Sequence, residues 1–370
     1  MHSPIDARAA EVADKLALLR ETLEQTGAGA IRLRGADWFA WATAGADAAT
    51  PAACETGAPE VLVTRDDAVI LTDETEAERL RQEQVPSGFT FHIAPWAELE
   101  LREPYVLGAA AGAAVLTDRP HHADQAVAPL PASLRLRRMV LGADEQARYR
   151  LLGQDAAAAV GEVLRAARPD WTELELAGAA ARALWARGIR PAGLAAAGER
   201  RLALYCRAAP SHERLGARAT LQVCARRHGL HANLTRSLSF GSAPPEQDAL
   251  LQVEATGLDA VRPGNSLAAV YHALDAAYRH ADRPDAIRLQ HQGGITGYAA
   301  REIVATPSTA TGLESGMALA FNPGFAGIRI EDTFLLGPHG LEQLTRDPHW
   351  PAADVQGRAR TRWLEKTDDE

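Results

Sequence analysis

Cysteine is scarce in this chain of 370 residues, and the three present (Cys54, Cys206 and Cys224) form no CxxC pair. An odd number of cysteines without that spacing argues against a disulfide framework and indicates reduced thiols. Long apolar runs are also missing. The N-terminal segment MHSPIDARAAEVADK carries charges and has no apolar core, and no later stretch has the length of a membrane span. We therefore expect a cytoplasmic protein without a membrane partner.

Positive charge is in deficit as well. The formal net charge is −9, and the sequence has neither a basic stripe nor aromatic residues interleaved with basic ones. This pattern argues against nucleic acid as a partner. Hydrophobic residues make up 46% of the chain and charged residues 24%, which is ordinary for a globular protein. The length of 370 residues is enough for two domains that each bury a core.

Helix and strand patterns alternate in the first 140 residues. Apolar residues at positions 12, 16, 19 and 23 form one stripe of a helix over residues 7–25. Another helix is predicted at residues 75–84. Short apolar runs predict strands at residues 30–33, 61–64, 68–73, 89–93 and 106–109. We therefore predict a small α/β domain over residues 1–140.

Two pairs of helix patterns follow, one on each side of a strand hairpin. One helix is predicted from Asp144 to Ala167, and the next begins with a capping box formed by Thr172 and Glu175. The second pair follows residue 244 and repeats the order of the first. This echo predicts a domain of two αβ halves over residues 141–345.

The remaining residues, 346–370, are expected to form a C-terminal tail. A final helix is predicted around residues 356–365, with Trp350 and Trp363 as packing anchors.

The hairpin over residues 221–240 carries a row of polar side chains. Its two strands alternate polar and apolar residues on either side of Gly229. Because successive strand residues point to opposite faces, one face of the second strand holds His231, Asn233 and Thr235. The facing strand places Gln222 and Cys224 on one face. Such a row is either a solvated edge or the floor of a polar pocket.

This hairpin resembles the metal-binding hairpin of the creatinase/aminopeptidase family, the pita-bread enzymes. In that family one strand carries an Asp, a Gly follows seven residues later, and a second Asp comes just before a Thr-Arg or Thr-Ser pair. Gly229 and Thr235-Arg236 keep their places here, whereas Gln222 and Asn233 stand at the two Asp positions. The resemblance implies an α/β N-terminal domain and an α+β pita-bread C-terminal domain, with duplicated αβ halves and a curved antiparallel sheet.

Three further family positions lie downstream. In LQHQGGITGYAARE, glycines permit close backbone approach, and His291 matches the metal-binding His of the family's His-Gly-x-Gly element. Tyr298 stands where a second His would follow seven residues on. Asn322 replaces the Glu that precedes a Pro, and Glu331 in GIRIEDTFLL is retained.

The pocket implied by the resemblance has lost most of its negative charge. Two divalent ions bring four positive charges, and the family offsets them with four carboxylates, of which one remains here. Neutral amides are weak ligands for the transition metals of such sites. We therefore predict no metal and no other cofactor. The amides keep the outline and the hydrogen-bonding capacity of the acids, which favours a repurposed site over a decayed one.

The leading hypothesis is a metal-independent, creatinase-like hydrolase that cleaves a C–N bond of a small amino-acid, guanidino or peptide-like substrate. Such chemistry needs a base and a stabiliser of developing charge. His291 or His231 is the candidate base, and Glu331 orients it or binds a cationic group. In the family a loop His contacts the substrate, and its nearest counterpart here is Arg207 or a neighbour. The candidate substrate-binding residues are Gln222, Asn233, Asn322, Tyr298, Arg301, Arg227 and Trp38.

Two alternatives remain open. The chain is either a non-catalytic pita-bread protein that binds a peptide, an amino-acid derivative or a protein, or an Xaa-Pro-type metalloaminopeptidase. The resemblance also implies a homodimer in which the segment around Trp38 closes the partner's pocket. Core positions are nevertheless expected for at least two of Trp38, Phe39 and Trp41.

Overall fold

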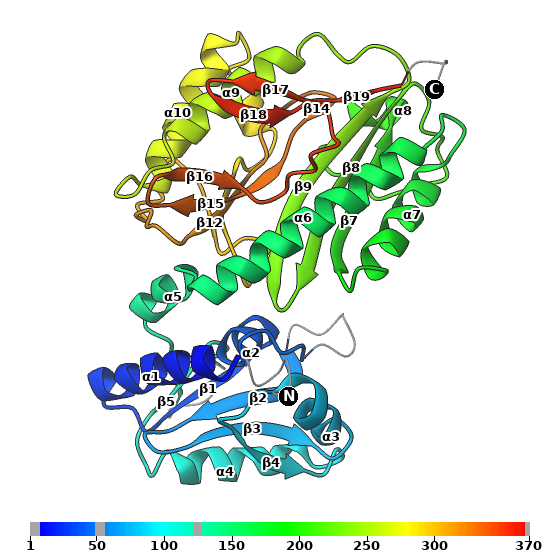
Figure 1. Cartoon of the computed structure of the whole chain (residues 1–370). Helices are drawn as coiled ribbons and strands as arrows, with labels where there is room; N and C mark the ends of the chain where they lie inside the picture. Colours follow the sequence, from blue (N-terminus) through cyan, green and yellow to red (C-terminus); the bar gives the residue numbers. More distant parts are fainter. Residues whose placement is uncertain (1–7, 49–55, 121–126, 367–370) are drawn as a thin grey trace. The chain divides into compact units, whose positions relative to one another are not determined.

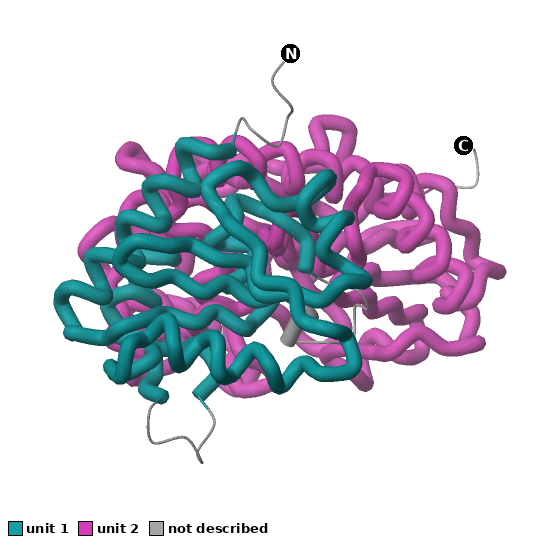
Figure 2. Tube along the Cα trace, turned by 90° about the horizontal axis from the view of Figure 1, so that it is seen from below, with its two compact units in different colours: residues 1–138 teal, residues 139–370 magenta. Residues whose placement is uncertain are grey.

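The computed structural model describes residues 8–48, 56–120 and 127–366. The chain divides into two compact units, Met1–Arg138 and Met139–Glu370, which Figure 2 colours separately. This division falls close to the boundary that the sequence places near residue 140. Among the described residues, no helix has both the length and the apolar character that crossing a membrane requires.

The first unit is built on a six-stranded mixed sheet with helices around it (Figure 1). The strand order is β4-β3-β2-β1-β5-β6, in which β2 is antiparallel to both neighbours and the other pairs are parallel. The strands are β1 Ala30–Gly35, β2 Thr56–Val63, β3 Ala68–Asp73, β4 Thr90–Ala94, β5 Val115–Thr117 and β6 Val127–Pro129. The helices are α1 Ala9–Thr26, α2 Ala36–Ala42, α3 Ala77–Arg79, α4 Arg102–Ala109 and α5 Ala132–Met139, with a π turn at Leu80–Gln84 and a 3-10 turn at Leu99–Leu101. The expected α/β domain is confirmed.

One strand predicted in this unit is wrong. Residues 106–109 form the end of helix α4, in which Val106 is buried and Leu107 is exposed. A run of four apolar residues is too short for its period to distinguish a helix from a strand. Strand β5, which begins at Val115, takes the place beside β1.

The three aromatic residues of helix α2 belong to the core of the first unit. Trp38, Phe39 and Trp41 are each at most 3% exposed. The rings of Trp38 and Trp41 meet edge to face with centroids 5.4 Å apart, and the guanidinium of Arg138 lies 4.2 Å from the Trp38 ring centroid. We therefore assign Trp38 to the core of its own unit, in place of the substrate-binding role expected from the sequence.

The second unit has the pita-bread architecture, with two αβ halves (Figure 1). In the first half, helices α6 Ala143–Ala166 and α7 Glu173–Trp185 lie along the sheet β19-β9-β8-β7. In the second, helices α9 Gln247–Asp259 and α10 Leu267–His280 precede the antiparallel sheet β11-β10-β12-β15-β16. The larger strands are β7 Arg190–Gly198, β8 Arg218–Arg227, β9 Leu230–Ser239, β10 Gly293–Thr296, β12 Ala318–Phe321, β15 Asp332–Gly337 and β16 Gly340–Gln343. The short elements are β11 Ile303–Val304, β13 Gly324–Phe325, β14 Ile328–Arg329, α8 Glu199–Leu202 and the 3-10 turn Ala286–Arg288.

Local signals fix several of these elements. The Thr172 side chain accepts a hydrogen bond from the Glu175 backbone N–H, so the predicted capping box is present, and Ser266 caps α10 in the same way. Strand β10 runs very close to both of its neighbours. A Cβ on Gly293 would lie 2.1 Å from the Ala320 carbonyl oxygen, and φ at Gly293 is +114°. Glycine is therefore required there, as the sequence predicts.

The C-terminal segment forms strands, and the helix predicted around residues 356–365 is wrong. Strands β17 Ala352–Val355 and β18 Arg358–Thr361 form a hairpin, and β19 Leu364–Glu365 adds a parallel strand beside β9. The two turn residues, Gln356 and Gly357, both have positive φ, as a two-residue hairpin turn requires. Trp350 and Trp363 are buried, so their expected role as packing anchors is confirmed.

Candidate functional site

The hairpin of β8 and β9 forms the floor of the candidate site. Gln222 pairs directly with Thr235, and Cys224 pairs with Asn233. Residues directly opposite each other in an antiparallel pair lie on the same face. The polar row predicted from the sequence is therefore a real feature of the second unit. Strand β9 meets the second half of the unit through a bridge between Thr235 and Glu331.

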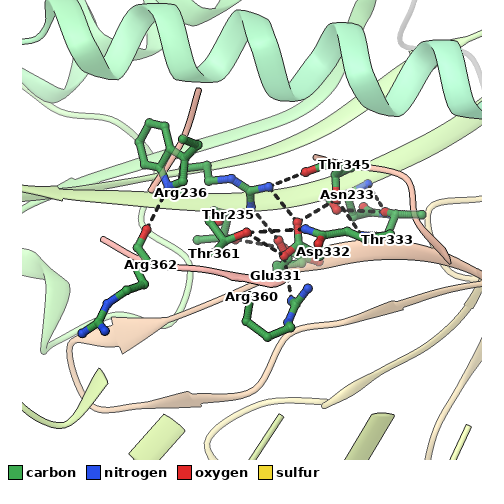
Figure 3. Close-up of polar contacts among 12 residues, drawn as sticks. Asn233, Thr235, Arg236, Glu331, Asp332, Thr333, Thr345, Arg360, Thr361 and Arg362 are labelled. Carbon is green, nitrogen blue, oxygen red and sulfur yellow. Dashed lines mark hydrogen bonds and ion pairs between the residues drawn. The ribbon is translucent and has the colours of Figure 1, made fainter. Parts of the chain in front are cut away.

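The Glu331 carboxylate is held from two sides. Its Oε2 accepts a hydrogen bond from Thr235 Oγ1 at 3.0 Å, and its Oε1 accepts one from Arg301 Nη2 at 2.6 Å. Figure 3 shows Glu331 beside Thr235. Both Glu331 and Arg301 are mostly shielded from solvent. The single acid retained at the five matched positions is thus neutralised by a guanidinium.

Asn322 lies on the other side of Arg301. Arg301 Nη2 is 3.5 Å from Asn322 Oδ1, and Asn322 Nδ2 donates to the His291 carbonyl oxygen at 3.1 Å. The amide therefore presents its oxygen to the guanidinium and its nitrogen to the chain. This arrangement links three segments, which contain His291, Arg301 and Asn322.

The two amides of the hairpin make separate contacts. Asn233 Nδ2 donates to Thr296 Oγ1 at 3.3 Å and to the Ala300 carbonyl oxygen at 3.4 Å. Gln222 Nε2 donates to the Cys206 carbonyl oxygen at 3.1 Å. Asn233 thereby contacts the segment leading to Arg301, and Gln222 ties the loop at residues 203–210 to the hairpin.

His291 lies in the coil before β10, and its side chain is exposed. Among the described residues its ring makes no hydrogen bond. Partial desolvation and the charge of Arg301 lower the pKa of His291, with smaller contributions from Arg207 and Arg329, and Glu331 opposes them. The imidazole is therefore neutral at neutral pH and able to accept a proton.

Sequence reasoning missed Arg329 as a site residue. It lies in β14, two positions before Glu331, and its guanidinium interacts with the Cys206 thiol. Desolvation lowers the pKa of Arg329, the Cys206 thiol and Glu331 oppose this shift, and Arg207 adds to it. The available signal was its position two residues from the one retained acid in GIRIED.

Three residues that the sequence suggests for the site make contacts to other groups of the protein. The Tyr298 hydroxyl donates to Glu145 Oε1 at 2.7 Å and its side chain is 1% exposed. Arg227 Nη1 contacts Asp155 Oδ2 at 2.7 Å, because residue 227 has the opposite strand parity to Gln222. The roles expected for Tyr298 and Arg227 are thus replaced by contacts to helix α6. His231 has the expected parity, but its Nδ1 lies 3.3 Å from the Gly297 carbonyl oxygen.

A buried charge network supports the site from behind. Asp332, next to Glu331, points to the opposite face of the chain. There it contacts Arg236 Nη2 at 2.7 Å and Arg360 Nη2 at 2.8 Å, and Arg360 also binds Glu254 at 2.7 Å (Figure 3 labels Arg236, Asp332 and Arg360). Burial would raise the pKa of Asp332, but Arg236 and Arg360 reverse this and lower it. Burial raises the pKa of Glu254. The network fixes the start of strand β15, directly after Glu331.

Within the described ranges, no group of three or more His, Cys, Asp or Glu side chains is placed to hold a metal ion.

Comparisons with known proteins agree with this architecture. A solved Xaa-Pro dipeptidase from Bacillus anthracis superposes with a TM-score of 0.75 at 18% identity, covering 91% of this chain and 98% of that one. A solved dipeptidase PepE from Mycobacterium ulcerans gives a TM-score of 0.74 at 21% identity, covering 97% and 98%. At these identities the likeness concerns the fold.

Sequence comparison covers a smaller region. An uncharacterized peptidase of Staphylococcus aureus (strain MRSA252) is 29% identical over 127 residues, which is 31% of this chain and 35% of that protein. The match thus spans about a third of the length of this curated relative. The family described as "Metallopeptidase family M24" matches residues 147–338, which is more than half of the chain. The chain therefore belongs to metallopeptidase family M24.

Proposed function

We propose that this protein is a metal-independent hydrolase of its family that cleaves a C–N bond in a small amino-acid, guanidino or peptide-like substrate. The observation that carries the proposal is the ion pair of 2.6 Å between Arg301 and Glu331. A guanidinium here supplies positive charge where the family name implies metal. The peptide substrates named for its structural relatives support a substrate with an amide-like bond.

The residues present do not fit two divalent ions. Both oxygens of Glu331 are engaged, one by Arg301 and the other by Thr235. Asn322 offers a neutral oxygen that already faces Arg301. A metal would have to displace a cation from the one carboxylate and then bind weak amide ligands.

The family pattern supports the same conclusion in a shifted register. When the His of the His-Gly-x-Gly element is aligned with Gly294, the second Gly of the element falls on Gly297. The second His position, seven residues after the first, falls on Arg301. Under this alignment a guanidinium takes the second His position, and the metal-binding His position falls on Gly294 instead of His291. It accounts for Arg301, rather than Tyr298, contacting Glu331.

The reaction uses the chain's own groups. His291 accepts a proton from a water molecule, and the water oxygen attacks the carbon of the C–N bond. With an amide or peptide-like substrate, Arg301 and the amide of Gln222 stabilise the negative charge that develops on the carbonyl oxygen. The C–N bond then breaks, and the proton held by His291 passes to the leaving nitrogen. Glu331 is a positioning residue that holds Arg301.

The test is turnover of guanidino, amidino and Xaa-Pro compounds by chelator-treated protein, together with elemental analysis. We expect less than about one tenth of an equivalent of transition metal, because one carboxylate cannot offset two divalent ions. Turnover should persist in chelator, disappear in His291→Ala and survive in His339→Ala, an exposed histidine in the β15–β16 turn. Chelator-sensitive aminopeptidase activity with one or two equivalents of metal would establish the metalloaminopeptidase alternative instead.

A non-catalytic binding protein is the second candidate. It is favoured by the His291 ring, which forms no hydrogen bond to an orienting acid among the described residues; nucleophilic and acid–base sites usually contain such a pair. Saturable binding of panel compounds without turnover of any of them would select this function.

A further inference from the structure

The candidate site holds more positive charge than its own residues neutralise. Arg207, Arg301 and Arg329 all act electrostatically on His291, and Glu331 is the one carboxylate that does so. Arg301 is paired with Glu331. Among the described residues, Arg207 and Arg329 have no ion pair with any carboxylate. Glu331 acts electrostatically on Arg329 as well, so one carboxylate faces three guanidinium groups.

Arg329 is the more confined of the two. Its Nε is buried and has no hydrogen-bond acceptor, and the same is true of Arg301 Nε. A Cβ built on Gly324 would lie 3.6 Å from Arg329 Nε and 3.5 Å from Gln290 Nε2. Gln290 Nε2 in turn donates a hydrogen bond to the Asn322 carbonyl oxygen. Arg329 is therefore packed beside the Asn322 segment. A buried donor without an acceptor costs free energy.

Arg207 belongs to a loop that is anchored on both sides of it. The Cys206 carbonyl oxygen accepts a hydrogen bond from Gln222, and Cys206 Sγ lies 3.4 Å from the Leu289 carbonyl oxygen. The Cys206 thiol also contacts the Arg329 guanidinium. The neighbouring Arg207 side chain is exposed and stays within electrostatic reach of Arg329. The two cations thus come from separate segments that meet at Cys206.

We propose that Arg207 and Arg329 form an oxyanion receptor for a small molecule that carries two negative charges, either a dicarboxylate or a phosphate ester. Guanidinium groups bind carboxylate and phosphate oxygens through paired N–H donors. Arg301 keeps its ion pair with Glu331. This receptor rests on the same pocket as the proposed hydrolase, but it does not depend on turnover.

The test is isothermal titration calorimetry on the full chain with inorganic phosphate, malonate and neutral malonamide as probes. One of the two anions should bind saturably, and malonamide should not. The tighter anion identifies the source of the ligand as phosphate or carboxylate. Arg207→Gln and Arg329→Gln should each weaken binding about tenfold or more, as loss of a charge-assisted contact predicts. Arg65→Gln, which removes an exposed arginine of the other unit, should leave the affinity unchanged.

Several outcomes would overturn the proposal. These are absence of saturable anion binding to the wild type, equal binding of malonamide, or equal weakening by Arg65→Gln. Arg207 is exposed, so its variant keeps the test decisive even if Arg329→Gln unfolds in a thermal melt. Anion binding without hydrolysis would contradict the proposed hydrolase alone, and hydrolysis without anion binding would contradict the receptor alone.

Discussion

At the scale of single residues, three amides and one acid decide the chemistry of the site. Gln222, Asn233 and Asn322 have the outline of carboxylates but none of their charge, and Glu331 keeps its charge because Arg301 balances it. Amides in these places satisfy fixed hydrogen bonds to neighbouring backbone and side-chain groups. Charge, more than shape, therefore separates this pocket from the family pattern.

Restoring the acids tests this balance. The triple variant Gln222→Asp, Asn233→Asp and Asn322→Glu puts up to four carboxylates together, and like charges so close repel one another and raise their pKa values. We expect a lower melting temperature near pH 7 without metal, and recovery on addition of manganese or cobalt, since a ligand of the folded state stabilises it by mass action. Thermal melts of the wild type with and without metal are the control. A variant as stable as the wild type and indifferent to metal would mean that these positions do not form one pocket.

Cys224 offers a second test, through its dependence on pH. Desolvation raises the pKa of this thiol to about 12. A folded pKa above the unfolded one means that the thiol's contribution to stability is complete below the unfolded pKa of about 9 and is lost as pH rises toward about 12. We expect slow alkylation of Cys224 at pH 8 and, in Cys224→Ala, a weaker loss of stability between pH 9 and 11. Cys206→Ala is the matched control, and rapid alkylation of Cys224 would contradict its raised pKa.

At the scale of elements, the C-terminal hairpin supports the site through one side chain. Arg360 on β18 reaches both Asp332 and Glu254 in the interior, while Arg358 on the same strand forms a partly exposed pair with Asp259. The sequence analysis predicts a helix there, and that prediction is wrong. This arginine-rich stretch has no strong apolar period from which its strands could be recognised. The strands form because the Gln356-Gly357 turn and buried partners from elsewhere in the chain favour them.

Removing these two arginines should therefore have unequal effects. Arg360→Ala leaves the buried Glu254 carboxylate without its cation and leaves Asp332 with Arg236 alone, and breaking a buried pair in this way costs about 3–5 kcal/mol. Arg358→Ala removes an exposed pair worth about 0–1 kcal/mol. Denaturant unfolding of both variants measures the difference in free energy. Equal, small losses would show that the network around Asp332 does not hold the hairpin.

At the scale of the whole molecule, the expected homodimer needs a new basis, because Trp38 is covered by its own unit. Exposed apolar side chains are frequent instead in residues 93–107, from the end of the edge strand β4 to helix α4; they are Ile93, Trp96, Leu99, Leu101, Tyr105 and Leu107. Exposed apolar surface is typical of interaction sites, and two-fold dimers are the commonest oligomers.

Light scattering at micromolar concentration should therefore give twice the 39.5 kDa of one chain. Trp96→Glu should shift the protein toward the monomer, because burying a charge in an apolar interface is unfavourable. Leu151→Glu, which changes an exposed apolar residue of the other unit, is the control. A wild-type mass near 39.5 kDa would exclude the dimer.

The sequence alone determines what depends on local periodicity. The alternation in residues 221–240 predicts the polar face of the hairpin, the Thr172–Glu175 capping box predicts the start of α7, and the glycines of β10 predict its close approach to β12. Each signal acts within a few residues, so it can be read before the fold is known.

Only the tertiary structure decides which charges meet. Arg301 reaches Glu331 across 30 positions, Arg360 reaches Glu254 across 106, and Arg329 meets Cys206 from another segment. No sequence period encodes these pairs, because they form where segments distant along the chain pack together. The same packing decides that Arg301, and not Tyr298, lies against the one acid that the site retains.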